Sequence, residues 1–175
     1  MSQLLTQPPN TNFLVPNKFV LSFIRLPNMQ FFCQTVNLPG MNLSAVPRTT
    51  PFVDYPVPGE KLVYDPLTIT FLVDEDLASW REIHDWMRAL GFPTKFEEYK
   101  NLRKISKSIN PVTPQVSDAT LIMLNSNNRG NYRFKFHDAF PMTLAPFTMT
   151  TVNGADTILT ADATFSYSLF DIEKI

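Results

Sequence analysis

The stretch "DPLTITFLVDEDLASWREIHDWM", residues 65–87, changes from a strand pattern to a helix pattern within one short run. In residues 65–73 every second side chain from Leu67 to Val73 is apolar, and Thr68 and Thr70 lie between the first three of them, which is typical of a half-buried strand. The following apolar residues are spaced as on one face of a helix: Leu77, Trp80, Ile83, Met87 and Leu90. The stretch therefore predicts a strand over 65–73 and a helix over 74–91, ended by Gly91 and Pro93.

Three consecutive carboxylates lie where this strand meets the helix. We expect Asp74 to cap the helix and Glu75 and Asp76 to lie in its first turn, where each charge interacts favourably with the helix dipole by ~0.3–1 kcal/mol. The alternative is a catalytic or metal site that the three carboxylates form with His84. Capping explains the acidic residues without a ligand, and it is the interpretation we favour.

The rest of the sequence offers little catalytic or metal-binding chemistry. It has two histidines, one cysteine and five glycines, with no HExxH or CxxC spacing, no glycine-rich phosphate loop and no GxSxG elbow. We interpret Cys33 as a small buried apolar residue, His84 as a partly buried hydrogen-bonded residue, and His137 as part of a strand's polar face. The sequence therefore predicts a non-enzymatic protein without a cofactor or metal.

Composition places the chain among globular proteins and points to partners. Its 175 residues suit one domain, 1–175. Charged residues make up 18%, below the usual quarter, which we interpret as surface covered by other subunits. A net charge of −1 predicts no general attraction to nucleic acid or to an anionic membrane, and no apolar run reaches the roughly 18 residues that span a bilayer.

Further strands are expected on both sides of the opening stretch. Residues 18–26 and 31–38 predict a hairpin turning at Pro27 and Asn28, and the later patterns predict strands at 118–125, at 132–140 and at 157–172 after a turn at 152–156. The predicted fold class is mainly β, an antiparallel β-barrel or sandwich with one flanking α-helix. Trp80 is expected in the core, and Trp86 is expected to reach a neighbouring subunit.

Three segments fall outside this sheet. Residues 1–17 predict a flexible N-terminal arm, and 92–117 form a variable insertion that can hold a second amphipathic helix over 95–109. We interpret its basic run as solvated or facing a partner rather than binding nucleic acid. That run consists of Lys95, Lys100, Arg103, Lys104 and Lys107. Residues 41–61 contain four prolines, Pro47, Pro51, Pro56 and Pro58, so they cannot form a central strand, and 41–66 is predicted to be a long extended arm.

The arm is the predicted contact surface between subunits, because its apolar residues are costly to leave in water. The candidate interface residues are Val46, Pro47, Phe52, Val53, Tyr55, Val57 and Trp86.

Three motifs, "PNKFVLSFIRL" (16–26), "FFCQTVNLPG" (31–40) and "VPRTTPFVDYPVPGEKLVYDPLTITFLVDEDLASWREIHDWM" (46–87), occur in an order and spacing that resemble the tail tube proteins of contractile-tailed bacteriophages, the Hcp-like superfamily. The resemblance covers roughly residues 16–90 and the final strand. It implies hexameric rings that stack into a hollow tube inside a contractile sheath, the conduit for DNA ejection. On this resemblance 41–66 packs on adjacent subunits.

The same resemblance implies partners and a location. The partners are further copies of the chain, the tail sheath protein, baseplate and tail terminator proteins, and the tape measure protein and DNA in the lumen. The protein would be made in the bacterial host cytoplasm and incorporated in the virion. Three alternatives stay open: a baseplate-proximal tube initiator, a secretion-system tube protein, and a small β-barrel module that binds a ligand.

Overall fold

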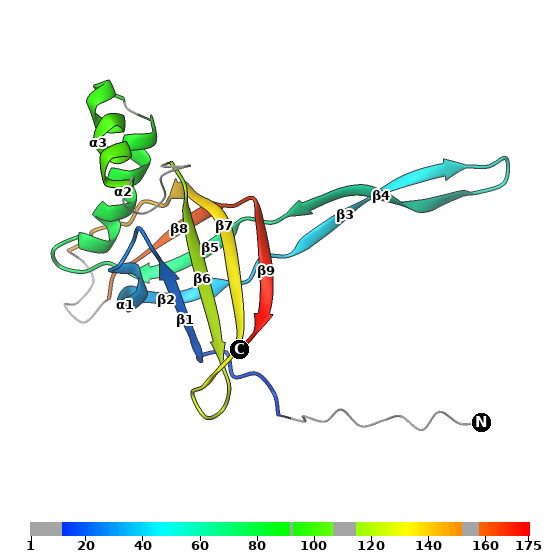
Figure 1. Cartoon of the computed structure of the whole chain (residues 1–175), viewed down its shortest axis with the longest axis horizontal. Helices are drawn as coiled ribbons and strands as arrows, with labels where there is room; N and C mark the ends of the chain where they lie inside the picture. Colours follow the sequence, from blue (N-terminus) through cyan, green and yellow to red (C-terminus); the bar gives the residue numbers. More distant parts are fainter. Residues whose placement is uncertain (1–11, 92, 107–114, 152–157) are drawn as a thin grey trace.

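A computed structural model describes residues 12–91, 93–106, 115–151 and 158–175. One seven-stranded antiparallel sheet forms the body, a two-stranded hairpin projects from it, and two helices lie at the end of the molecule away from the hairpin (Figure 1). The body strands are β1 (Phe19–Phe23), β2 (Cys33–Asn37), β5 (Leu67–Leu72), β6 (Ser117–Leu124), β7 (Gly130–Leu144), β8 (Thr160–Ser166) and β9 (Leu169–Lys174). The hairpin is β3 (Met41–Thr49) and β4 (Asp54–Tyr64), and the helices are α1 (Met29–Phe32), α2 (Ala78–Gly91) and α3 (Phe96–Ser106).

The 15-residue strand β7 holds two half sheets together. Up to Ala139 it pairs with β6 and, over Tyr132–His137, also with β9, whereas Phe140–Leu144 pair with β8. The strand changes partners at Asp138, whose φ of 54° is left-handed and turns the backbone. We call β1, β6, β9 and the start of β7 the first half sheet, and the end of β7 with β8, β5 and β2 the second.

The body is an open, folded sheet and not a closed barrel. Strand order runs β1-β6-β7-β8-β5-β2, so β1 and β2 are the two ends, and no pairing joins them among the described residues. The two half sheets meet through aromatic side chains, since Phe23 of β1 packs on Phe165 of β8 with ring centroids 4.8 Å apart. Of the two architectures that the sequence predicts, the sandwich-like arrangement is therefore the one observed.

The strand expected at 65–73 lies at the centre of this core. Leu67, Ile69 and Phe71 of β5 have no exposed surface, and Ala161 and Ala163 of the neighbouring β8 are also buried. The small alanines leave room for the larger side chains opposite them, which allows close packing between the half sheets. The alternation seen in the sequence thus identifies the buried face correctly.

The hairpin expected over 18–38 is wrong. β1 pairs with β6 and β2 pairs with β5, so the two strands belong to different half sheets. The chain between them forms the short helix α1, whose Met29 is fully buried together with Leu26. Burial of these two side chains in the core outweighs the local turn signal, which carries no information about distant partners.

The single long strand expected over 157–172 is also wrong, since it divides into β8 and β9. β8 pairs in the second half sheet and β9 in the first, with Tyr167 and Ser168 between them. Tyr167 is buried and its hydroxyl donates to the carbonyl oxygen of Asp65 at 2.8 Å, which holds the crossing point. Leu169, the first residue of β9, is 41% exposed because the buried face changes at this crossing. The turn expected at 152–156 lies outside the described residues.

Three helices replace the one that the predicted fold class contains. α2 is the expected helix, although it begins at Ala78 and not at residue 74. α3 forms within the insertion, where the amphipathic pattern allowed for it, and is attached to α2 by an ion pair of Arg88 with Glu98 at 3.0 Å. Gln115 gives a second attachment, since its carbonyl accepts from the Trp86 indole at 3.1 Å and its amide donates to the Tyr99 hydroxyl at 2.6 Å.

Of the two tryptophans of α2, Trp86 lies within the core and Trp80 packs at its edge, the reverse of the expected order of burial. Trp86 is 3% exposed and packs in the core, 6.4 Å from Phe165, whereas Trp80 is half-buried and stacks on His84 at 5.2 Å. The buried face of α2 is centred on Ser79, Ile83, Trp86 and Ala89. The small side chains of Ser79 and Ala89, near the two ends of this face, let the helix approach the sheet closely. The buried face is therefore rotated relative to the apolar face that the sequence predicts, which contained Trp80 in place of Trp86.

We therefore expect Trp86→Ala to lower the free energy of unfolding by about 3–5 kcal/mol, the usual cost of emptying a large buried aromatic site. Trp80→Ala, which removes a half-buried ring, should cost clearly less. Urea denaturation of both variants measures the two values. A larger loss for Trp80→Ala would contradict the assignment of Trp86 to the core.

Candidate assembly interface

The predicted arm is a long β-hairpin that stands free of the body. β3 pairs with β4 from Met41 opposite Tyr64 to Thr49 opposite Asp54, and the pair extends away from the sheet on the side opposite α3 (Figure 1). An isolated two-stranded hairpin is marginally stable in water, because one pair of strands buries little apolar surface. A hairpin of this length therefore gains most from a surface on which to pack.

Apolar side chains are exposed along the whole hairpin. At the tip, Phe52 is 97% exposed and Val53 63%. Behind the tip, Val46 lies opposite Val57, and Arg48 lies opposite Tyr55 with its guanidinium 6.0 Å from the ring centre. The structure thus gathers the six predicted arm residues on one exposed element. Trp86, the seventh predicted interface residue, is instead buried in the core because of the helix rotation described above.

The prolines decide which part of the hairpin can make contacts. Pro47 lies opposite Pro56, and Pro58 lies opposite Ala45. A hydrogen-bonded antiparallel pair needs an N–H on each residue, so these pairs occupy the positions whose backbone groups point outward. The outer edges of the hairpin consequently lack backbone N–H donors at all three prolines, which disfavours pairing of these edges with another strand. The faces and the tip of the hairpin are therefore its surfaces best suited to contacts.

Gly59 fixes the register of the hairpin. The pairing shifts between Leu43 and Ala45, and Gly59 lies against Ser44 at this irregularity. A Cβ added to Gly59 would collide with the Ser44 hydroxyl oxygen and come within 2.7 Å of its carbonyl oxygen. The same hydroxyl accepts from the backbone N–H of Lys61 at 3.3 Å. Only glycine allows the two backbones to approach this closely.

We expect Gly59→Ala to loosen the hairpin without unfolding the body. Hydrogen exchange of the amides in β3 and β4 should become faster, because the added methyl group separates the strands. The urea transition of the body should stay within about 0.5 kcal/mol of wild type, as for other surface changes. Unchanged exchange in the hairpin would show that the close approach at Ser44 is not required.

The acidic run at 74–76 divides into one structural residue and two exposed ones. The Asp74 carboxylate accepts from the N–H of Ala78 at 2.9 Å, the N–H of Ser79 at 3.1 Å and the Ser79 hydroxyl at 2.8 Å. It caps α2 as predicted, across a turn in which Leu77 has a φ of 55°. Glu75 and Asp76 precede the helix, so their predicted place in its first turn is wrong.

Desolvation raises the pKa of Asp74, but the hydrogen bonds from Ala78 and Ser79 outweigh it, so the pKa lies below its ordinary value. Because the folded pKa is depressed, this contribution to stability is present above the ordinary aspartate pKa and is lost as the pH falls through the folded value.

Asp74→Ala should therefore destabilise the protein by about 0.5–2 kcal/mol at neutral pH, the usual cost of losing an N-cap. The difference from wild type should shrink toward low pH as the carboxyl group protonates. The matched control, Glu75→Gln with Asp76→Asn, should change stability by less than about 0.5 kcal/mol. Urea denaturation at a series of pH values measures both, and equal losses for the two variants would contradict the cap.

The titratable side chains do not assemble into a catalytic centre in the described part of the chain. His84 contacts Asp85 at 3.2 Å and stacks on Trp80, while His137 contacts Asp171 at 3.1 Å on the outer face of β7 and β9. Burial raises the pKa of the Cys33 thiol to about 11, the opposite of what a nucleophile needs. No three His, Cys, Asp or Glu side chains among the described residues are grouped closely enough to hold a metal ion.

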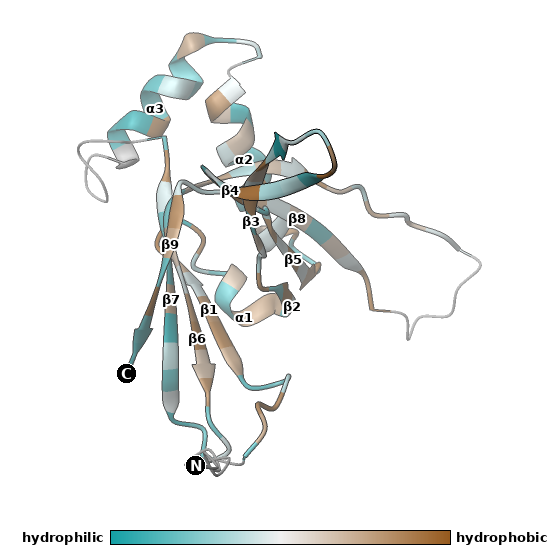
Figure 2. Cartoon of the chain, turned by 90° about the vertical axis from the view of Figure 1, so that its right-hand side faces the viewer, coloured by the Kyte–Doolittle hydropathy of each residue, from teal (hydrophilic) through white to brown (hydrophobic). Residues whose placement is uncertain are grey.

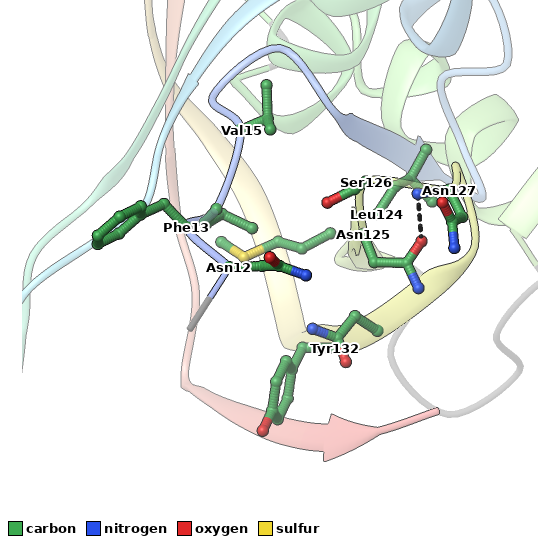
Figure 3. A pocket seen from close by; sticks show the side chains of 11 residues that line it. Asn12, Phe13, Val15, Leu124, Asn125, Ser126, Asn127 and Tyr132 are labelled. Atoms are coloured by element: carbon green, nitrogen blue, oxygen red, sulfur yellow. Dashed lines mark hydrogen bonds between the residues drawn. The ribbon is translucent and has the colours of Figure 1, made fainter. Parts of the chain in front are cut away.

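One hollow lies between the N-terminal segment and the turn from β6 to β7 (Figure 3). It has a volume of about 370 Å³ and is lined mainly by amide and apolar side chains, among them Asn12, Val15, Asn125 and Tyr132. The Asn125 side chain accepts from the Asn127 N–H at 2.9 Å, so it stabilises the turn itself (Figure 3). Among the described residues, the lining has no carboxylate, histidine or lysine that could act as an acid or base.

These features define a class of protein by its fold: a folded antiparallel β-sheet body that carries a long, exposed apolar hairpin. The phage tail tube protein family matches residues 12–173, and the chain belongs to this family. It is 27% identical over 179 residues to the tail tube terminator protein of Enterobacteria phage T4, covering 99% of this chain and 93% of the relative.

Solved structures share the fold at low sequence identity. A chain in the baseplate of the anti-feeding prophage superposes with a TM-score of 0.65 at 13% identity, covering 94% of this chain and 97% of that one. A chain of the tube-terminating cap of the same particle gives 0.61 at 13% identity, with all of both chains covered. Among the described helices, none is long and apolar enough to cross a membrane.

Proposed function

We propose that this protein is a structural subunit of a contractile phage tail and that it forms the ring that terminates the tail tube. The observation that carries the proposal is the similarity to the T4 terminator, which extends over nearly the whole of both chains. The sequence alone favoured the repeating tube subunit. A terminator, as its name states, ends the tube, whereas the repeating subunit builds it.

The surface of the body supports assembly into a ring. In the described residues β1 pairs with β6 alone and β9 with β7 alone, so each has one free edge on the first half sheet. Two different free edges on one half sheet can pair head to tail, and a ring is the closed arrangement that leaves neither of these two edges exposed. On this proposal six copies close the ring, as in the family that the sequence resembles, and no catalytic activity or cofactor is involved.

The hairpin supports attachment of the ring to the tube. Full burial of an exposed Phe or Val side chain stabilises a contact by about 1.5–3 kcal/mol, so Phe52 and Val53 together can anchor one ring on the next. The blunted edges direct the hairpin onto an existing surface and oppose open-ended sheet growth. The partner surface then belongs to another tail component, and the protein is a part of the virion.

The second candidate is the repeating tube subunit, whose stacked rings form the conduit for DNA. The family description, phage tail tube protein, favours it, and the exposed hairpin suits ring-to-ring contacts equally well. The two candidates differ in whether the protein alone polymerises.

Purified protein should therefore form single rings and not tubes. Native mass spectrometry over a concentration series gives the number of copies, and negative-stain micrographs give the length of the particles. Long tubes of the pure protein would favour the repeating subunit. A monomer at every concentration would contradict both candidates and would favour the small binding module.

Attachment to the tube should depend on the hairpin tip. We expect Phe52→Ser with Val53→Ser to leave the rings intact but to weaken their binding to sheathless tail tubes by about tenfold or more, since tenfold corresponds to only ~1.4 kcal/mol. The matched control is Phe13→Ser, because Phe13 is 92% exposed but lies on the N-terminal segment. Co-sedimentation with the tubes measures binding, and equal binding of wild type and the tip variant would show that the tip is not the anchor.

A further inference from the structure

Helix α3 presents a basic surface that the chain itself does not neutralise. Its exposed cations are Lys95, directly before the helix, and Lys100, Arg103 and Lys104 within it. In the described part of the chain no carboxylate lies within ion-pair distance of any of the four. Figure 2 shows the helix largely in hydrophilic colours. We call these four residues the basic surface.

The acidic residue best placed to neutralise this surface is already used. Glu98 lies on α3 but faces α2, where both of its carboxylate oxygens accept from Arg88, at 3.0 and 3.4 Å. That contact and the Tyr99–Gln115 hydrogen bond fix the position of the helix. The helix that carries the basic surface is therefore held in place, which lowers the entropic cost of docking a partner on it.

The acidic turn provides the opposite charge on the same chain. Glu75 and Asp76 are exposed, and no ion pair or hydrogen bond involves their side chains among the described residues. They precede the first residue of α2, while α3 follows its last residue. Among the described residues, no ion pair joins these two carboxylates to the basic surface within one copy.

We propose that the acidic turn of one copy contacts the basic surface of the next copy in the ring. The inference rests on the proposed ring, and it names one pair of surfaces that sets the order of its subunits. Two different and complementary surfaces on one chain produce a head-to-tail contact, the kind that closes a ring. Complementary charge chiefly selects the correct partner and orientation and opposes wrong pairings. A second copy is the partner because it always presents the matching charge.

A charge exchange tests the proposal. Glu75→Lys with Asp76→Lys, and separately Lys100→Glu with Arg103→Glu and Lys104→Glu, should each raise the concentration needed for half-maximal ring formation by about tenfold or more, because like charges then face each other. For the chain that carries all five changes, the concentration needed for half-maximal ring formation should lie within about threefold of the wild-type value. The two surfaces are then complementary again, with their charges reversed. Native mass spectrometry and mass photometry measure ring formation.

Two controls separate this interaction from loss of structure. Glu97→Lys, on the same helix, keeps the sign of the basic surface and should assemble as wild type does. Circular dichroism should show the same helix content in every variant. If both charge-reversed variants form rings like wild type, or if the five-change chain does not recover, the inference is wrong. Binding of DNA that is lost with the three α3 changes, without any effect on rings, would also overturn it.

The outcome for wild type distinguishes the inference from the proposed function. Wild-type protein that stays monomeric contradicts the ring and, with it, the contact inferred here. If wild type forms rings and the charge-reversed variants form them equally well, only the contact between the acidic turn and α3 is contradicted.

Discussion

The continuous backbone pairing of β7 is the constraint on which the rest of the structure depends. This strand pairs with β6 and β9 along its first part and with β8 along its end, so a single chain segment defines both half sheets. The turn of the backbone at Asp138 allows those half sheets to face each other. The core of aromatic and aliphatic residues then fills the space between them, and Trp86 of α2 closes one end of it.

Because this core is complete within one copy, the hairpin is free to serve contacts outside it. β3 and β4 extend from the body and keep their apolar residues exposed, while their prolines remove donors from the outer edges. The element is thus suited to docking by its faces and unsuited to uncontrolled sheet extension. Gly59 maintains the close approach of the two strands that this shape requires.

The helices and the turn before them carry exposed charges of both signs on a chain that is nearly neutral as a whole. Asp74 is committed to the start of α2 and Glu98 to the ion pair between α2 and α3. With these two acids already engaged, Glu75 and Asp76 before α2 and the cations of α3 remain exposed without an ion pair among the described residues. A net charge of −1 therefore conceals a separation of charge, and this separation can orient one subunit against another.

The sequence by itself determined the local features of this protein. The alternation in 65–73 identified the buried face of β5, the prolines of 41–66 excluded a central strand, and Asp74 was recognised as a cap. These features depend on the spacing of apolar residues, on the backbone N–H donors that prolines lack and on short-range hydrogen bonds. All three are determined by residues that are close together in the sequence. The order and spacing of the motifs also pointed to the family to which the chain belongs.

Only the tertiary structure decided how those pieces combine. The segments of 18–38 pair with different distant strands, the final strand changes half sheet at Tyr167, and α2 rotates so that Trp86 and not Trp80 enters the core. Each of these outcomes depends on which distant surfaces compete for the same side chain, and local propensity does not encode that competition. The exposed state of Glu75 and Asp76 follows in the same way, because packing of Ser79 against the sheet sets where α2 begins.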